Sequence, residues 1–427
     1  VVGIATQSNG TRVLSDTFTT GYGGVYLQHQ DSPYINGNTI TANYRGIELY
    51  DADDSVQVQK NRIVLSGQAY GIYLYICDGT QFGGKGLIAN NFVQIGGAST
   101  AYGLYIESST YQNVYYNSVN ITSTYTAGGI AFLPSNGSNI SARNNIFANN
   151  GGGYAYYTTT PAAVANSNYN DLYSPGNFVG YWGTTNVRDL AAFKTVSGKD
   201  TNSVSIYPQY LSATDLHNSS PWLDSAATPI SSVTQDIDEE TRDASKPDIG
   251  ADEFVAAPST LTPLAGSYTI GLVLSAAADY PTLAAAVSDL VLKGVSAPVT
   301  LNIQSGSYNE QISIVSIPGA SATNTVTFQS QTGNAADVQW FFAANSASNN
   351  YLVKLSSADN ITFQNLSLFA TGTSYARVFE LSGAVENAKI LNNTLSGFAT
   401  TSGSAQYALI YVDNSYTSNL QITGNNF

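Results

Sequence analysis

Acidic and basic side chains that could act together in catalysis are concentrated in one short stretch of the sequence. Asp51, Asp53 and Asp54 are followed closely by Lys60 and Arg62. Carboxylate oxygens are the ligands that Ca²⁺ prefers, and a lysine or arginine beside a bound substrate can serve as a base. The stretch is therefore a candidate Ca²⁺ site with a base beside it, provided that acids on neighbouring segments lie in register with it; Asp31, Asp78 and Glu107 are the acids that could do so.

The other reactive residues do not form a recognisable catalytic set. The two histidines, His29 and His217, are far apart in the sequence, and we expect structural or surface positions for both. The acidic run 236–240 could bind Ca²⁺, although a solvated loop is the favoured interpretation. No glycine-rich loop leads from a strand into a helix in the manner of nucleotide-binding proteins. We therefore predict no metal site and no cofactor.

The composition narrows the class of partner. The 427 residues carry a net charge of −14, which disfavours nucleic acids and anionic lipids as partners. Charged residues make up 10% of the chain, against about 25% in an ordinary globular domain, and 30 tyrosines supply part of the polar surface. Cys77 is the one cysteine, so there is no disulfide framework. The sequence contains no run of about 20 apolar residues, so it does not predict a membrane-spanning segment. We expect an extracellular protein at the cell surface.

A strand that begins with glycine recurs along the first third of the chain. Its glycines are Gly24, Gly46, Gly71, Gly103 and Gly129, at steps of 22, 25, 32 and 26 residues. Apolar residues alternate after each glycine, as Val25 and Leu27 do, and are expected to point into a common core. The alternate tyrosines Tyr26, Tyr73 and Tyr105 are then expected to form an outward aromatic row that could stack on glycans.

A second strand, which carries asparagine, recurs at the same mean period. Its asparagines are Asn38, Asn61, Asn91, Asn117 and Asn145, and later Asn365, Asn393 and Asn426. We interpret them as structural residues at sharp turns, where asparagine tolerates the left-handed conformation and can bond to the turns above and below. The glycine and asparagine repeats share a period in the middle twenties of residues. This shared period predicts an all-β fold, a right-handed parallel β-helix solenoid.

The repeats divide the chain into two consecutive units. Residues 1–254 are expected to be the C-terminal part of a first unit, with coils over 1–150 and a closing region over 151–254 that covers the last coil. A helix is predicted at 187–195, with Asn186 or Thr185 as its cap. A linker rich in Pro, Ser and Thr is expected at 255–265, since its composition breaks regular structure.

Residues 266–427 are expected to be the N-terminal part of a second unit that opens with a capping helix at 281–293. Pro281 is placed in the first turn of that helix. The chain begins without Met and ends within the asparagine repeat, so we expect it to be a piece of a longer tandem array.

Two blocks of sequence resemble known β-helix families. The run from NSNYNDLY through DLAAFKTVSGKD to PDIGADEF is similar to the end of the tandem β-helix units in giant secreted surface proteins of Bacteroidetes. The block that contains Gly306, Tyr308 and Glu310 resembles the opening of the pectate-lyase and pectin-methylesterase superfamily. That second resemblance implies a test for enzyme motifs, and the Arg-Pro, Trp-Asp-His and Asp-Phe-Ile signatures of those enzymes are absent.

The resemblance to surface proteins also brings two candidate modification sites. Asp54-Ser55-Val56 and Asp224-Ser225-Ala226 resemble the Asp-Ser/Thr-aliphatic sites of O-glycosylation in Bacteroidetes, with Ser55 and Ser225 as acceptors.

Three functions are consistent with these patterns. The leading hypothesis is a non-enzymatic structural or adhesive segment, a stiff rod whose partners are neighbouring repeat units of the same polypeptide and surface glycans. The alternatives are a polysaccharide-active enzyme that uses one groove of the solenoid, and a dedicated glycan-binding module.

Overall fold

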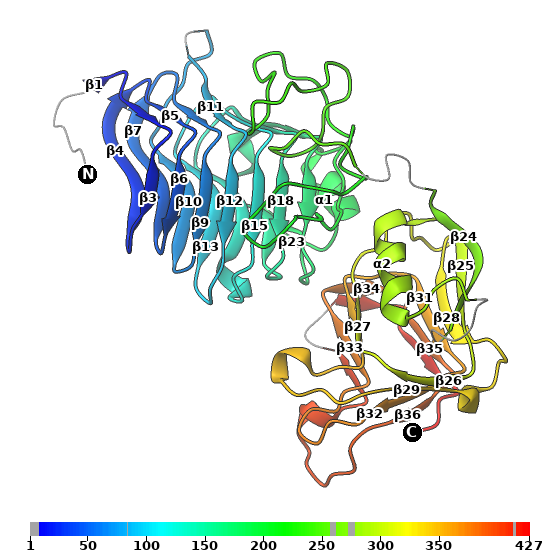
Figure 1. Cartoon of the computed structure of the whole chain (residues 1–427). Helices are drawn as coiled ribbons and strands as arrows, with labels where there is room; N and C mark the ends of the chain where they lie inside the picture. Colours follow the sequence, from blue (N-terminus) through cyan, green and yellow to red (C-terminus); the bar gives the residue numbers. More distant parts are fainter. Residues whose placement is uncertain (1–7, 83, 257–261, 272–277, 413–415) are drawn as a thin grey trace. The chain divides into compact units, whose positions relative to one another are not determined.

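The computed structural model describes residues 8–82, 84–256, 262–271, 278–412 and 416–427. The chain divides into two compact units, Val1–Thr260 and Leu261–Phe427. In both units short parallel strands stack coil upon coil, as Figure 1 shows. The prediction of an all-β, right-handed parallel β-helix is therefore confirmed. No helix in the described residues is both long enough and apolar enough to cross a membrane. The predicted linker 255–265 falls partly on residues 257–261, outside the described residues.

Three sheets run along the first unit, and each coil contributes one strand to each sheet. Sheet A contains β1 (Ser8–Asn9), β4 (Gly23–Asp31), β7 (Arg45–Asp53), β10 (Ala69–Tyr75), β13 (Ala101–Glu107), β16 (Gly129–Ser135), β19 (Tyr154–Thr158), β22 (Gly180–Trp182) and β23 (Thr185–Val187). Sheet B contains β2 (Arg12–Leu14), β5 (Tyr34–Asn36), β8 (Gln57–Gln59), β11 (Gly86–Ala89), β14 (Gln112–Tyr115), β17 (Ile140–Arg143) and β20 (Val164–Asn168). Sheet C contains β3 (Thr17–Thr19), β6 (Thr39–Ala42), β9 (Arg62–Leu65), β12 (Phe92–Ile95), β15 (Ser118–Ile121), β18 (Ile146–Asn149) and β21 (Asp171–Tyr173).

Inward side chains of successive coils fill the bore of this solenoid. Ile47, Ile72 and Leu104 occupy one register position of sheet A, and all three are fully buried. Phe132 follows Leu104 in the next coil, so the partner of Gly103 is Ala131. The predicted alignment on Gly129 was wrong by two residues, because the equivalent position is occupied by Ala131 and not by a glycine. The correct step from Gly103 is 28 residues, 103 to 131.

The glycine repeat has a steric cause. A Cβ on Gly71 would lie 2.4 Å from the Gly103 carbonyl oxygen and 2.4 Å from Cγ1 of Val93. Backbone and core approach so closely at this position that any side chain would collide with both. Gly46 and Gly103 meet the same obstruction from the coil and the core residue beside them.

Asparagine side chains form a continuous buried ladder between sheets B and C. The Nδ2 of each donates to the Oδ1 of the next, over 2.9–3.0 Å, along the series Asn38, Asn61, Asn91, Asn117, Asn145 and Asn170. Each Oδ1 also accepts a backbone N–H from the preceding coil, as Asn117 does from Asn91 at 3.1 Å. The ladder ends where Asn170 donates to Oδ1 of Asp200 at 3.0 Å.

The expectation that these asparagines adopt the left-handed conformation was wrong for the first unit. The positive φ belongs to the residue before each ladder position, for example 54° at Lys60 and 51° at Tyr116. The ladder residue needs an extended backbone, because its side chain must point inward to meet the coils on either side.

In the second unit, two of the predicted asparagines lie one residue away from the ladder position. Asn365 has φ 55° and precedes Leu366, whose N–H donates to Oδ1 of Asn393 at 3.0 Å. Asn393 in turn donates to Asn425 at 3.1 Å, so Asn425 takes the ladder position that was predicted for Asn426.

Coils continue past residue 150, where the prediction placed the start of the closing region. Strands β19, β20 and β21 complete a further coil that contains Asn170. The end of sheet A is covered by the antiparallel β23 and by α1 (Leu190–Ser197), whose buried Phe193 packs 5.4 Å from the ring of Trp182.

The predicted cap of helix α1 was wrong. The N-cap is Asp189, whose carboxylate accepts from the Ala192 N–H at 2.7 Å. Thr185 and Asn186 belong to β23, whose pairing with β22 holds them in an extended conformation.

Residues 205–256, here called the return segment, run back along the side of the coils. The Nδ2 of Asn144 donates to Thr228 O at 2.7 Å, and that of Asn90 donates to Gln235 O at 2.8 Å. Asn120 donates to Ala213 O at 3.2 Å. The closing region therefore covers a lateral face of the solenoid as well as the last coil. Its hydrogen bonds to Asn90, Asn120 and Asn144 connect several earlier coils to one another.

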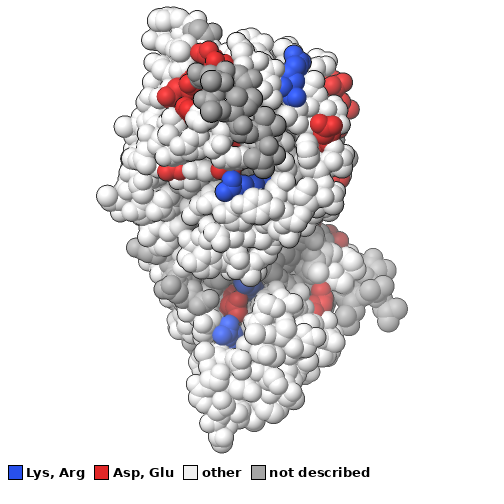
Figure 2. All heavy atoms as spheres, turned by 90° about the vertical axis from the view of Figure 1, so that its left-hand side faces the viewer, with Lys and Arg blue, Asp and Glu red and all other residues white. Residues whose placement is uncertain are grey.

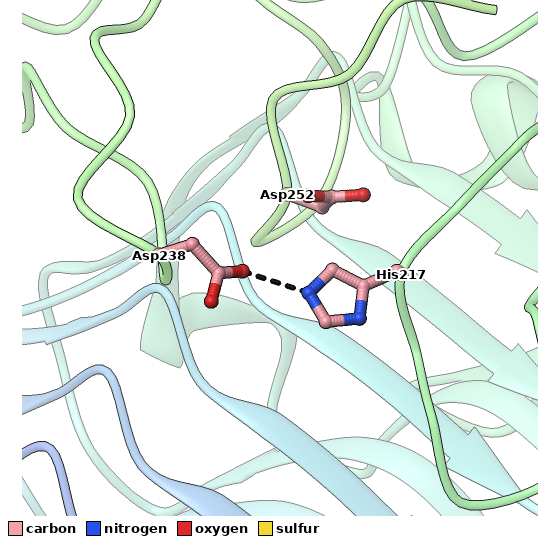
Figure 3. A group of neighbouring side chains, drawn as sticks. All are labelled: His217, Asp238 and Asp252. Atoms are coloured by element: carbon pink, nitrogen blue, oxygen red, sulfur yellow. Dashed lines mark hydrogen bonds and ion pairs between the residues drawn. The ribbon is translucent and has the colours of Figure 1, made fainter.

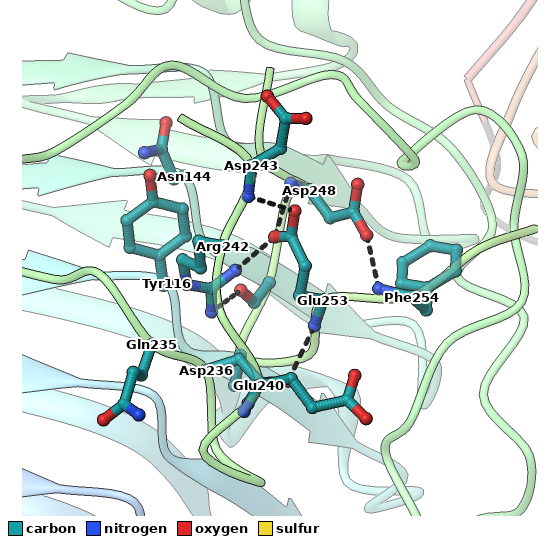
Figure 4. A network of polar contacts seen from close by, with 12 residues as sticks. Tyr116, Asn144, Gln235, Asp236, Glu240, Arg242, Asp243, Asp248, Glu253 and Phe254 are labelled. Carbon is teal, nitrogen blue, oxygen red and sulfur yellow. Dashed lines mark hydrogen bonds and ion pairs between the residues drawn. The ribbon is translucent and has the colours of Figure 1, made fainter. Parts of the chain in front are cut away.

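Arg242 is the buried anchor of the return segment (Figure 4). Its Nη1 lies 3.1 Å from Oε2 of Glu253, and its Nη2 donates to Oδ1 of Asn90 at 2.9 Å. The guanidinium stacks over the ring of Tyr116 at 4.0 Å from the centroid. Asp236 accepts backbone N–H groups and is fully buried, so the acidic run 236–240 is not the wholly solvated loop that we expected.

The second unit repeats the architecture. One sheet contains β24 (Leu264–Ile270), β25 (Val295–Ile303), β28 (Val326–Ser330), β31 (Ile361–Gln364), β35 (Lys389–Leu391) and β39 (Gln421–Thr423). The others contain β26 (Gly306–Asn309), β29 (Val338–Phe342), β32 (Ser367–Ala370) and β36 (Thr394–Ser396); β27 (Ile312–Ile314), β30 (Val353–Ser356), β33 (Phe379–Ser382) and β37 (Ile410–Val412); and β34 (Ala384–Glu386) with β38 (Tyr416–Ser418). Short 3₁₀ helices are η1 (Thr126–Gly128) and η2 (Pro161–Ala163) in the first unit, and η3 (Ala335–Asp337), η4 (Ala347–Asn349) and η5 (Ala405–Tyr407) in the second.

Helix α2 (Leu283–Lys293) packs Leu283 and Leu290 into the core of the second unit. Its N-cap is Thr282, so Pro281 lies before the helix and not in its first turn. Glu310, the acid of the Gly306-Tyr308-Glu310 motif, accepts the Leu283 and Ala284 N–H groups at 3.1 and 3.0 Å. A carboxylate there complements the positive end of the helix dipole, which gives the motif a structural role.

Candidate functional site

The outer surface of sheet A is covered by tyrosine rings. We call this surface the tyrosine face. It consists of Tyr22, Tyr26, Tyr44, Tyr50, Tyr70, Tyr73, Tyr75, Tyr102 and Tyr105, on or just before strands β4, β7, β10 and β13. The rings contact one another across coils, with Tyr73 and Tyr105 stacked at 4.7 Å between centroids. All of them keep part of their surface in contact with solvent.

The three predicted tyrosines do not form one continuous row. Tyr73 lies opposite Tyr105, but Glu48 occupies the register position between Tyr26 and Tyr73. The unbroken row is the one beside it, Tyr22, Tyr44, Tyr70 and Tyr102, with centroid separations of 5.1, 5.9 and 5.5 Å. Sequence reasoning missed this row because its members precede the glycines that marked the repeat.

The charged side chains Arg45 and Glu48 on the tyrosine face pair with each other. Arg45 forms an ion pair with Glu48, and its guanidinium lies 5.6 Å from the ring centroid of Tyr26 and 5.1 Å from that of Tyr44. Burial raises the pKa of Glu48 above its ordinary value, and Arg45 opposes that rise. Figure 2 shows one face of the molecule, on which acidic and basic side chains are sparse among the other residues.

The phenols of Tyr73 and Tyr105 on the tyrosine face stay protonated at neutral pH. Burial, with a hydrogen bond to Glu107, raises the pKa of Tyr73, and the same causes raise that of Tyr105. Each phenol therefore offers an apolar ring together with a hydroxyl group that can donate or accept a hydrogen bond.

The acidic and basic residues of the stretch 51–62 are not brought together. Asp51 pairs with Nδ1 of His29 at 2.6 Å. Arg62 lies on sheet C and binds Asp238 of the return segment at 2.6 Å, while Lys60 lies 3.8 Å from Glu239. The acids and bases of the hypothetical Ca²⁺ site therefore serve different contacts in the described structure.

A different group gathers around His217 (Figure 3). Its Nε2 lies 2.7 Å from Oδ2 of Asp238, and its Nδ1 contacts Oδ1 of Asp215. Asp252, which is 7% exposed, completes the group. The neighbouring carboxylates raise the pKa of His217 against the effect of its burial. Sequence reasoning missed the group because the return segment assembles it; the Asp-Leu-His spacing of 215–217 was the one local signal.

A small pocket adjoins this group on the outer surface of sheet C. Its volume is about 160 Å³, and it is lined by Arg62, Phe92 and Gln94 on the coils and by Thr214, Asp215 and His217 on the return segment, among others. The edge of the His217 ring packs against Phe92 at 5.0 Å between centroids.

The candidate glycosylation serines differ in accessibility. Ser225 is exposed, and its Oγ donates to Asp224 at 2.8 Å. Ser55 is half-buried in a turn beside Gly84, where a Cβ on the glycine would lie 2.1 Å from the serine Oγ. A glycan would therefore meet less steric resistance at Ser225.

Comparison with known proteins supports the fold. Residues 2–186, less than half of the chain, match the family described as periplasmic copper-binding protein (NosD), which has a parallel β-helix fold. No curated protein matches the chain. A solved structure of a PL6 family alginate lyase, AlyGC, matches with 11% identity over 92% of this chain and 69% of that one. Its TM-score is 0.18, so that match carries no argument about function.

Proposed function

We propose that this chain is a rigid β-helical segment of a secreted or cell-envelope protein, and that its tyrosine face binds neutral glycans. The observation that carries the proposal is the unbroken Tyr22–Tyr44–Tyr70–Tyr102 row with the Tyr73–Tyr105 stack beside it. Tyrosine gives large amphipathic contact area at low entropic cost, which suits the flat apolar faces and hydroxyl rims of sugar rings.

The charge pattern favours neutral over acidic glycans. The protein carries a net charge of −14, so a polyanion is repelled at long range. Arg45, which could have bound a carboxylate of the glycan, is already paired with Glu48.

The proposed setting is a tandem array of such units outside the cytoplasm. The word periplasmic in the name of the matched family is consistent with that setting, as is the resemblance to repeat units of Bacteroidetes surface proteins. In such an array neighbouring units of the same polypeptide are the first partners, and repeated weak sites would add up by multivalency.

Copper binding is not part of the proposal, because the matched residues 2–186 do not offer a set of typical copper ligands. Copper sites use histidine, cysteine and methionine, and the whole sequence contains two His, one Cys and no Met. Within the matched range, Cys77 is fully buried and the Nδ1 of His29 is paired with Asp51.

Retention of the whole chain on immobilised neutral polysaccharides tests the proposal. A double substitution Tyr73→Ala and Tyr105→Ala removes two stacked rings, each worth about 0.5–1.5 kcal/mol, so binding should weaken about 5- to 150-fold. Tyr34→Ala on sheet B is the matched control and should bind as the unmodified chain does. Equal retention of the double variant and the unmodified chain would refute the assignment of the face.

The proposal involves no catalysis. Incubation of the whole chain with polygalacturonans and alginates, followed by detection of unsaturated uronides, tests the alternative of polysaccharide cleavage. Product formation above a boiled control would contradict the proposal.

A further inference from the structure

The His217 group has the composition of a metal centre. One nitrogen or oxygen atom from each of His217, Asp238 and Asp252 lies within 4.8 Å of the others (Figure 3). All three residues belong to the return segment, and they are held against the coils by the Asp238–Arg62 ion pair at 2.6 Å. Their position is therefore fixed by the packing of two parts of the first unit.

Asp215 stands where a metal-bound histidine needs a partner. It contacts Nδ1 of His217, on the side of the ring opposite Asp238. A carboxylate that accepts the Nδ1–H directs the lone pair of Nε2 toward the other ligands, and such pairs accompany most metal-bound histidines. This arrangement is independent of the three candidate ligands.

Asp252 adds a largely buried carboxylate to the group. It is 7% exposed, and its Oδ2 accepts the Asn218 N–H at 3.0 Å. Burial of a carboxylate beside other acids is costly, and a bound cation would lower that cost.

The pocket leaves room for the remaining ligands of an ion. Asp215 and His217 line both the group and the pocket of about 160 Å³. Three protein ligands with a water in an open position are the usual arrangement of a reactive zinc site. Asp238 must shift slightly, because two ligands at about 2.1 Å on a tetrahedral ion lie about 3.4 Å apart, whereas its Oδ2 lies 2.7 Å from Nε2 of His217. Its side chain is 38% exposed, and its other carboxylate oxygen is the one that pairs with Arg62.

We propose that His217 Nε2, Asp238 and Asp252 bind a divalent transition-metal ion such as Zn²⁺, with Asp215 orienting the histidine. The mixture of imidazole and carboxylate ligands suits Zn²⁺ better than Ca²⁺, which prefers oxygen alone. Three carboxylates against the single guanidinium of Arg62 give the group the negative charge that a divalent ion requires. The site lies apart from the tyrosine face and does not depend on the proposed function.

The test uses the whole chain and Zn²⁺ alone. Calorimetry of metal-free protein should show one site, and replacement by Co²⁺ should give the intense visible absorption of a four-coordinate N/O site. His217→Gln should abolish the site, and Asp215→Asn should weaken it about 10- to 100-fold, as loss of an outer-shell partner does elsewhere. The matched control is His29→Gln, which removes the other histidine and its Asp51 pair and should leave binding unchanged.

A measurement on the unmodified sequence keeps the proposal falsifiable if a variant fails to fold. With ring-¹⁵N histidine labels, Zn²⁺ should shift the Nε2 resonance of one of the two histidines and leave the other in place. Binding that survives His217→Gln, a shift of both imidazoles or of neither, or the absence of saturable binding would each overturn it.

Discussion

The asparagine ladder makes a quantitative prediction at Asn117, which lies in the middle of the row. Its Oδ1 accepts the N–H and the Nδ2 of Asn91, at 3.1 and 2.9 Å. Its Nδ2 donates to Oδ1 of Asn145 and to the Ile88 carbonyl, each at 2.9 Å. The side chain is fully buried, so water cannot replace these partners.

Asn117→Ala is therefore expected to destabilise the first unit by about 3 kcal/mol. The orphaned Asn91 N–H costs about 1–3 kcal/mol, and the other lost hydrogen bonds add about 1 kcal/mol each, less what relaxation recovers. Asn117→Asp keeps the oxygens but puts one against Oδ1 of Asn145 without a donor, so it should cost at least as much. Asn9→Ala, at an exposed position, is the control and should stay within about 0.5 kcal/mol.

Urea unfolding of the whole chain, followed by circular dichroism, measures these differences. Hydrogen exchange resolved by mass spectrometry assigns the transition to peptides of the first unit, and protection should fall most in the coils on either side of residue 117. A cost below about 1 kcal/mol for Asn117→Ala would refute the reasoning, since it would mean that the ladder bonds are replaceable by solvent.

Two further predictions concern the return segment and the tyrosine face. Arg242→Leu should destabilise the first unit by about 3–5 kcal/mol, because Glu253 and Asn90 lose a buried donor. Arg188→Ala, which breaks a more exposed pair with Asp189, should cost under about 1 kcal/mol in the same assay; similar costs for both would contradict the anchoring role. The raised pKa values of Tyr73 and Tyr105 mean that the folded state holds its phenolic protons more tightly than the unfolded state, so stability should be lost as pH rises above about 10. Absorbance at 295 nm should show phenols in native protein that resist ionisation relative to protein in urea, and superimposable curves would disprove it.

The sequence predicted those parts of the fold in which the stacking of coils imposes the same requirement on every coil. Inward residues such as Ile47, Ile72 and Leu104 must be apolar and must recur, because each contacts its equivalent in the next coil. Errors arose where two identical residues stand together. At Asn425-Asn426, composition does not distinguish the residue that fills the repeat position from its neighbour, whereas backbone geometry does. At Gly128-Gly129 the glycines drew the alignment away from Ala131, which fills the repeat position without being glycine.

The His217 group could not be predicted in this way. Its members come from a segment without periodicity, and the contact between Asp238 and Arg62 joins residues 176 positions apart. Folding back of the return segment creates that proximity, and nothing in the local sequence specifies which coil the segment will meet. The buried Arg242 fixes this register, since Asn90 on one coil and Tyr116 on the next both contact it.

Tyrosine on sheet A is not required by the fold, and this is the strongest reason to assign it a function. A β-propensity effect alone would place tyrosine at outward positions of all the sheets of the first unit. Sheet C instead presents residues such as Thr41, Gln94 and Asn120, and its later strands are covered by the return segment. The rings gather on the sheet that the return segment leaves open. At such half-exposed positions, a large aromatic side chain adds little to the stability of the coils that a smaller side chain would not. The proposed glycan contact would account for that placement, and a coil rise close to 4.8 Å would then set the distance at which successive rings meet a ligand.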